Sequence, residues 1–192
     1  PSAHKKSAPH TNNNLTIHAL YTANKILVIT ADSAEYVYNA TQRSVTTATV
    51  NVSGVTVSGY TVSGSRTDVG STTTTVTLGA VKIMSGSSDV TYQYDVSTAN
   101  GLLTITPATT TATATGYDEK YDGLAHGITV TPAVTSGSTI AYSLTEGTLP
   151  TDYTLPASPT ETNYTPGTTV YYVVTNPNYL PVYGSAVITI DP

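Results

Sequence analysis

Apolar and polar residues alternate along most of the chain, a pattern typical of β-strands with one buried face. The first example is formed by Leu15, Ile17, Ala19 and Tyr21, whose side chains fall on one face of an extended segment. The apolar run ILVIT follows at residues 26–30. This pattern predicts two strands or one long bent strand near the start of the chain.

The alternation continues in residues 44–64, where Val alternates with Thr or Ser. Three glycines, Gly54, Gly59 and Gly64, are expected to break this stretch into separate strands. SGSSD at residues 85–89 has the composition of a turn. Short strands with turn signals about every 8 to 12 residues, without a helical apolar stripe, predict an all-β (mainly β) fold of the Ig-like sandwich or β-grasp-like kind.

An internal repeat divides the chain. LLTITP at residues 102–107 recurs as VITIDP at residues 187–192, about 85 residues later. YVYNATQ at residues 36–42 matches EKYDGLA at residues 119–125, about 83 residues later. The repeat predicts two tandem small β-modules in an elongated arrangement.

The predicted boundaries follow from this repeat. Residues 1–26 are expected to be an N-terminal leader or linker that could contribute an extra strand. Residues 27–107 form the first predicted module, and residues 108–192 form the second. Residues 1–14 are polar and contain two prolines, which is typical of a tail or linker.

Composition narrows the classes of partner. Charged residues make up 10% of the chain and the net charge is -5, so no basic surface is expected for nucleic acid or anionic lipid. No apolar run approaches the roughly 20 residues that span a bilayer, so membrane insertion is not expected. The absence of cysteine excludes disulfides, thiolate nucleophiles and Cys-ligated zinc. All 15 aromatic residues are tyrosine, which suits thin β-modules better than one thick core.

The stretch KYDGLAHGITVTP at residues 120–132 brings Asp122 and His126 close together in sequence. They could form a small reactive site, or they could belong to a turn before a strand at residues 128–131. Gly123 accepts a positive φ without steric cost, and an aspartate can bond a nearby backbone amide. We interpret the stretch as a turn.

The matching position of the first copy supports a structural role. Asn39 replaces the aspartate there and also tolerates the left-handed region, whereas a catalytic aspartate would not be exchanged so readily. The tyrosine before it is kept and is expected to hold the turn against its module. The structural turn residues predicted in this way are Tyr38, Asn39, Tyr121, Asp122 and Gly123.

Other chemistry is weakly indicated. Asp118, Glu119 and Asp122 are the nearest approach to a cation site, but they do not match a calcium loop. No G-x-S-x-G elbow is present, and GSRTDVGS lacks the lysine and the helix of a phosphate-binding loop. No catalytic residue, no cofactor and no metal site is predicted. An isopeptide crosslink would need a buried lysine beside Asn or Asp, and the sequence pairs neither Lys25 nor Lys82 in this way.

These motifs together resemble the MBG and YDG-type repeat modules of bacterial surface proteins and adhesins. In the first module the resemblance rests on ITADSAEYVYN (29–39), GSRTDVGS (64–71) and VKIMSGSSDVTYQYDVSTANGLLTITP (81–107). In the second it rests on KYDGLAHGITV (120–130), TVYYVVTNPNY (169–179) and GSAVITI (184–190). The first module departs from the pattern where Asn39 and Ala40 stand in place of Asp-Gly. The resemblance implies an extended stalk or adhesive array, with no enzymatic residues to carry over.

We therefore expect a non-enzymatic, extracellular segment of a bacterial cell-surface protein, in which tandem β-repeats form a stalk. Its expected partners are other domains of the same protein or neighbouring copies, and host or environmental glycans or proteins. One alternative is a filament subunit that donates Leu15, Ile17, Ala19 and Tyr21 as an exchanged strand, because an added strand satisfies an exposed sheet edge.

A second alternative is a carbohydrate-binding module. Tyrosine rings that face solvent can stack on sugars, and Tyr171, Tyr172 and Tyr179 are the candidates for this role. In a strand, however, successive side chains point to opposite faces, so a YY pair ordinarily places one ring inside.

Overall fold

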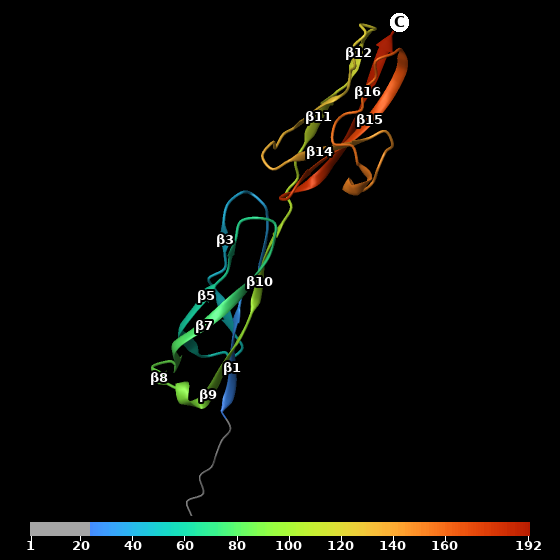
Figure 1. The fold of residues 1–192 in the computed structure, drawn as a ribbon. Coiled ribbons are helices and arrows are strands. Elements are labelled where there is room, and N and C mark those ends of the chain that lie inside the picture. The colour runs from blue at the N-terminus through green and yellow to red at the C-terminus, as the bar shows by residue number, and fades with distance from the viewer. Residues whose placement is uncertain (1–23) are drawn as a thin grey trace, which may run out of the picture.

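The computed structural model describes residues 24–192, and the prediction of an all-β protein is confirmed there. The helical segments in this part of the chain are two short 3-10 turns, η1 (Thr91–Gln93) and η2 (Pro150–Asp152). No helix in residues 24–192 is long and apolar enough to cross a membrane. The strands fall into two sets, which we call the first and second modules (Figure 1).

The first module contains ten strands. They are β1 (Lys25–Ala31), β2 (Ala34–Val37), β3 (Arg43–Ser44), β4 (Ala48–Val50), β5 (Thr56–Ser63), β6 (Ser65–Arg66), β7 (Gly70–Ser85), β8 (Ser88–Asp89), β9 (Tyr94–Ala99) and β10 (Gly101–Thr106). One sheet has the order β4-β1-β9, a second has the order β2-β10-β7-β5 with β8 paired to β7, and β3 pairs with β6. Because β1 begins at Lys25, the last two residues of the predicted leader belong to a strand.

The second module contains six strands. They are β11 (Ala112–Thr115), β12 (Tyr117–Lys120), β13 (Thr129–Pro132), β14 (Thr139–Ser143), β15 (Thr165–Asn176) and β16 (Tyr179–Asp191). One sheet has the order β12-β16-β15-β14, and β11 pairs with β13. Every strand ladder in residues 24–192 joins strands of the same module.

The two modules share their central pairing. In the first, β2 runs parallel to β10 with Ala34 opposite Leu103, and β10 is antiparallel to β7. In the second, β12 runs parallel to β16 with Tyr117 opposite Ile188, and β16 is antiparallel to β15. Residues about 83 to 85 positions apart in sequence therefore occupy equivalent places in the two modules.

Alternation along the strands builds small separate cores. In β1, Leu27 and Ile29 are fully buried and pack with Ile83 of β7. In the second module, Ile188 is fully buried in a cluster that also contains Tyr172. A side chain on every second residue therefore faces inward, as expected for strands with one buried face.

Gly59 corrects one expectation from the sequence. The predicted break does not occur, because β5 continues through Gly59 to Ser63. Gly59 adopts a φ of 80°, and the register with β7 shifts between Ser58 and Tyr60, which is a β-bulge. The glycine therefore bends the strand without ending it.

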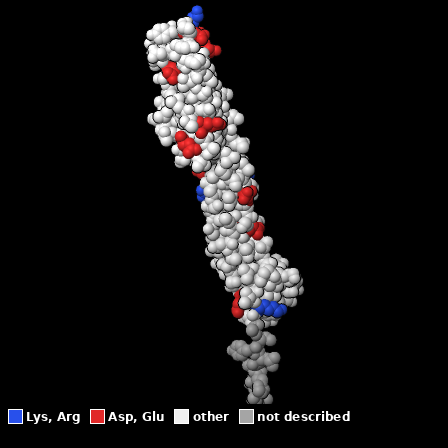
Figure 2. Space-filling view, turned by 90° about the vertical axis from the view of Figure 1, so that its right-hand side faces the viewer, with Lys and Arg blue, Asp and Glu red and all other residues white. Residues whose placement is uncertain are grey.

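The modules lie end to end and form an elongated molecule (Figures 1 and 2). The tip of the β15–β16 hairpin lies beside the segment that joins the modules (Figure 1). Charged side chains are sparse on the face drawn in Figure 2 and are scattered along its length. The contacts between the modules are therefore made by their facing ends.

Because each module has its own core, we expect core substitutions to act locally. Leu103→Ala and Ile188→Ala should each lower the free energy of unfolding of their own module by about 2 to 5 kcal/mol, since both side chains are fully buried. Urea-dependent hydrogen exchange resolved by residue measures both modules in one sample. Equal loss of protection in both modules from either substitution would contradict this expectation.

Candidate functional site

The turn predicted in the second module is formed by local hydrogen bonds. The Leu124 N–H donates to Asp122 Oδ1 over 2.8 Å, and Gly123 adopts a φ of 80°. The Tyr121 N–H donates to the Asp191 carbonyl over 2.9 Å and so attaches the turn to the end of β16. Asp122 thus uses its carboxylate for a turn that follows β12.

The first module forms the same turn with different residues. The Thr41 N–H donates to Asn39 Oδ1 over 3.1 Å, and the Tyr38 N–H donates to the Thr106 carbonyl over 2.9 Å. Among residues 24–192, Ala40 is the one non-glycine residue with a positive φ, at 62°. The backbone geometry is therefore kept although the Asp-Gly pair is absent.

The side chain of His126 contacts the turn and β12. Its Nε2 lies 2.8 Å from Asp122 Oδ1, and its ring stacks on Tyr117 with centroids 3.6 Å apart. The pKa of the Asp122 carboxyl lies below its ordinary value. The main cause is the hydrogen bond to His126, and the hydrogen bond from the Leu124 N–H is the second. The backbone of His126 also exchanges two hydrogen bonds with Glu161, as Arg43 pairs with Arg66 in the first module. These contacts fasten the loop that follows the turn.

The candidate cation ligands are not gathered into a site. Asp118 and Glu119 are exposed on β12. In the part of the chain that the structure describes, no group of three His, Cys, Asp or Glu side chains is arranged to hold a metal ion. The residues proposed for strand exchange, Leu15 to Tyr21, lie outside the described residues.

The most extensive contact between modules involves Asn178, in the turn between β15 and β16. Its Oδ1 accepts a hydrogen bond from the Val69 N–H over 2.9 Å, and its Nδ2 donates to Asp68 Oδ1 over 3.0 Å. Beside it, the Tyr179 ring packs edge-on against Tyr38 of the first module, with centroids 5.4 Å apart and an angle of 80°. We call the contacts of these residues the junction.

The linker at the junction is one residue long. Thr106 is bonded to the first module through Tyr38. Ala108 is bonded to the second, because its N–H donates to the Asn178 carbonyl and its carbonyl accepts from the Leu180 N–H. Only Pro107 separates these two residues, and the proline ring restricts its own φ to about -65°.

Arg66 shapes the surface that Asn178 meets. Its guanidinium donates to the carbonyls of Asp68 and Val69, both over 2.7 Å, and of Ser71 over 3.1 Å. A side chain at Gly70 would collide with this guanidinium. The loop before β7 is therefore held in place with the Val69 N–H and the Asp68 carboxylate facing the second module.

Sequence reasoning missed Asn178 and Asp68 as a pair. GSRTDVGS contains Asp68 and TNPNY contains Asn178, and each stands out as a motif. The two residues that pair are, however, 110 positions apart in sequence. A turn rich in Asn and Pro indicates a loop, and nothing local indicates which surface that loop contacts.

The tyrosines suggested for sugar stacking are used elsewhere. Tyr172 is 4% exposed, Tyr171 is half-buried, and Tyr179 contacts Tyr38 at the junction. These three rings therefore offer little exposed surface for stacking on a sugar.

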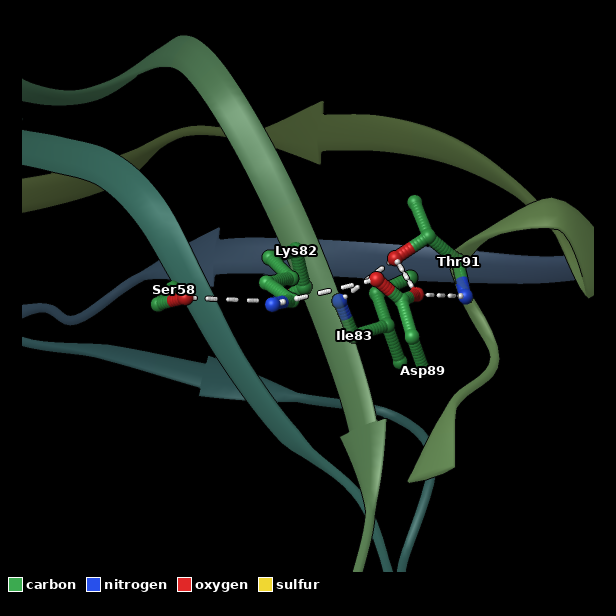
Figure 3. A network of polar contacts seen from close by, with 5 residues as sticks. All are labelled: Ser58, Lys82, Ile83, Asp89 and Thr91. Carbon is green, nitrogen blue, oxygen red and sulfur yellow. Dashed lines mark hydrogen bonds and ion pairs between the residues drawn. The ribbon is translucent and has the colours of Figure 1, made fainter. Parts of the chain in front are cut away.

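Lys82 lies in an exposed polar network (Figure 3) beside β8, which is at the end of the first module away from the second (Figure 1). Its Nζ is 3.9 Å from Asp89 Oδ2, and both side chains are more than half exposed. The hydroxyl of Thr91 donates to Asp89 Oδ1 over 2.7 Å and accepts from the Ile83 N–H over 2.9 Å. An exposed ion pair of this kind differs from the buried setting that an isopeptide crosslink needs.

No known family model matches the chain, and comparison with curated proteins finds no similar sequence. The resemblance to MBG and YDG-type modules therefore stays a prediction that rests on the motifs quoted above.

The turn comparison predicts opposite effects of two substitutions. Ala40→Gly should stabilise the first module by about 0.5 to 1 kcal/mol, because it removes the strain of a side chain at positive φ. Gly123→Ala should destabilise the second module by about 1 kcal/mol for the same reason. Urea unfolding of each variant measures both changes. Destabilisation by Ala40→Gly would contradict the role assigned to this turn.

The lowered pKa of Asp122 predicts acid sensitivity of the second module. A carboxyl group with a depressed folded-state pKa stabilises the fold above its unfolded pKa of about 3.9, and this contribution is lost as the pH falls through the folded value. Asp122→Asn cannot titrate but can keep the bond from Leu124, as Asn39 does in the first module. We expect a smaller loss of second-module stability in this variant as the pH falls below about 4.

The matched control is Asp89→Asn. The pKa of Asp89 is also lowered, mainly by its hydrogen bond from the Thr91 hydroxyl, but Asp89 lies in the first module. Its substitution should reduce the acid sensitivity of the first module alone. The interpretation fails if unfolding followed by residue-resolved hydrogen exchange shows the same acid profile in Asp122→Asn as in the unchanged protein.

Proposed function

We propose that this chain is a non-enzymatic structural segment, a rigid spacer of two β-modules in the stalk of an extracellular bacterial surface protein. The observation that carries the proposal is the junction, in which Asn178 binds both Asp68 and Val69 across a linker of one residue. Two modules fixed end to end hold their far ends apart, which is what a spacer does. The proposed extracellular location rests on the resemblance to surface-protein repeats.

The strength of the junction supports rigidity. Two hydrogen bonds and one aromatic pair together contribute about 2 to 3 kcal/mol. This corresponds to a preference of roughly 30- to 150-fold for the docked arrangement over an open one. The restricted φ of Pro107 further limits the orientations that an open form could adopt.

The chemistry of the described residues fits a structural role. The paired side chains singled out in the sequence, Asp122 and His126, take part in a turn and a ring stack. Their contacts hold loops in place.

Removing the Asn178 side chain should make the molecule flexible. Asn178→Ala deletes both hydrogen bonds to the first module but leaves the backbone bonds of Ala108 intact. We expect roughly a tenfold or greater rise in the open population. Small-angle scattering should show a broader distance distribution, and fluorescence anisotropy should show faster motion of each module.

Gln93→Ala is the matched control. Gln93 comes directly before Tyr94, as Asn178 comes directly before Tyr179 in the other copy, but it faces no other described module. Its substitution should leave the scattering profile unchanged. If the unaltered protein already scatters as two modules on a flexible tether, the rigid-spacer proposal is wrong.

A further inference from the structure

The far end of the second module repeats the surface that the first module uses at the junction. Tyr121 occupies the place of Tyr38, because each donates its N–H to the last residue of the neighbouring strand, Asp191 or Thr106. Each is followed by the same side-chain-bonded turn. The equivalence therefore rests on hydrogen bonds as well as on sequence spacing.

The polar half of the junction is repeated as well. Asp68 and Val69 directly precede β7, and Asn163 and Tyr164 directly precede β15. The Asn163 side chain offers a carbonyl oxygen where Asp68 offers a carboxylate, and both accept hydrogen bonds. Within residues 24–192 the Tyr164 N–H has no hydrogen-bond partner, whereas the Val69 N–H is bonded to Asn178.

The apolar side chains of this end are exposed. Tyr121 is 56% exposed, Leu124 is 62% exposed and Tyr164 is 60% exposed. Tyr38, by contrast, packs against both its own module and Tyr179. We call Tyr121, Leu124, Asn163 and Tyr164 the distal end. Exposed aromatic and aliphatic groups around an amide are typical of a surface that a partner covers.

We infer that the distal end docks the hairpin tip of another module of this fold, carried on the same polypeptide. This inference rests on the proposed spacer function. A ring at the position of Tyr179 would pack on Tyr121, and an amide at the position of Asn178 would bind Asn163 and the Tyr164 N–H. Pro192 follows β16 as Pro107 follows β10, so the same residue type stands directly after the last strand of both modules.

The docked module must be covalently linked to this chain, because the contact between them is small. Stable complexes between separate proteins bury roughly 1,200 to 2,000 Å², and a junction made of one ring pair and two hydrogen bonds is much smaller. A one-residue linker keeps the partner at an effective concentration of about millimolar or above, so the same contacts suffice.

The test extends the chain with a second copy of residues 108–192 placed directly after Pro192. The appended part can fold by itself, because all strand ladders of the second module lie within it. Hydrogen exchange is then measured at two amides, Val69 in the existing junction and Tyr164 in the new one. We expect exchange at Tyr164 to slow by roughly tenfold or more relative to the unextended chain.

Two variants of the extended chain identify the contact. Replacing the counterpart of Asn178 by Ala in the appended copy alone should restore fast exchange at Tyr164 and leave Val69 protected. Tyr121→Ala should weaken the protection of Tyr164 without unfolding the second module, because this side chain is exposed in the unextended chain. Gln93→Ala should change neither amide.

The outcomes separate the two proposals. Protection at Val69 without slower exchange at Tyr164 would overturn the distal-end inference and leave the spacer function standing. Fast exchange at both amides would remove the spacer proposal too. Sedimentation of the unextended chain provides a further check. If it pairs end to end at micromolar concentration, and Tyr164→Ala abolishes the pairing, the occupant is a second copy and the tethered-module inference is wrong.

Discussion

The shape of the protein depends on a linker of one residue. Thr106 is hydrogen-bonded to one module and Ala108 to the other, so Pro107 alone spans the boundary. Relative motion is the default for domains that share a small interface. Here the short linker keeps Asn178 next to Asp68, and a few hydrogen bonds can then maintain the docked arrangement.

The junction also depends on an ordered loop in the first module. Lys and Arg together number seven in the whole chain, and Arg66 directs its donors at backbone carbonyls around β7. This arrangement satisfies the carbonyls of Asp68 and Val69, which precede the strand, and holds the Val69 N–H in place within the first module. A loop ordered in advance loses less conformational entropy on contact.

The repeated turn shows which features of a motif are structural. Asn39 and Asp122 both accept a hydrogen bond from the backbone two residues later, and Ala40 and Gly123 both adopt positive φ. The geometry survives a change of charge and the addition of a side chain. A reactive carboxylate would not survive that exchange, so the shared property of the two copies is the shape of the turn.

Local patterns in the sequence determined the all-β class, the repeat and the turns, because strand alternation and turn chemistry depend on neighbouring residues. Gly59 shows the limit of such patterns, since a glycine that ends a strand and one that forms a bulge have the same local signal. Only the tertiary structure decided that Asn178 meets Asp68 and that Tyr121 is left exposed. Those outcomes depend on how the modules are oriented, and contacts between residues 110 positions apart set that orientation.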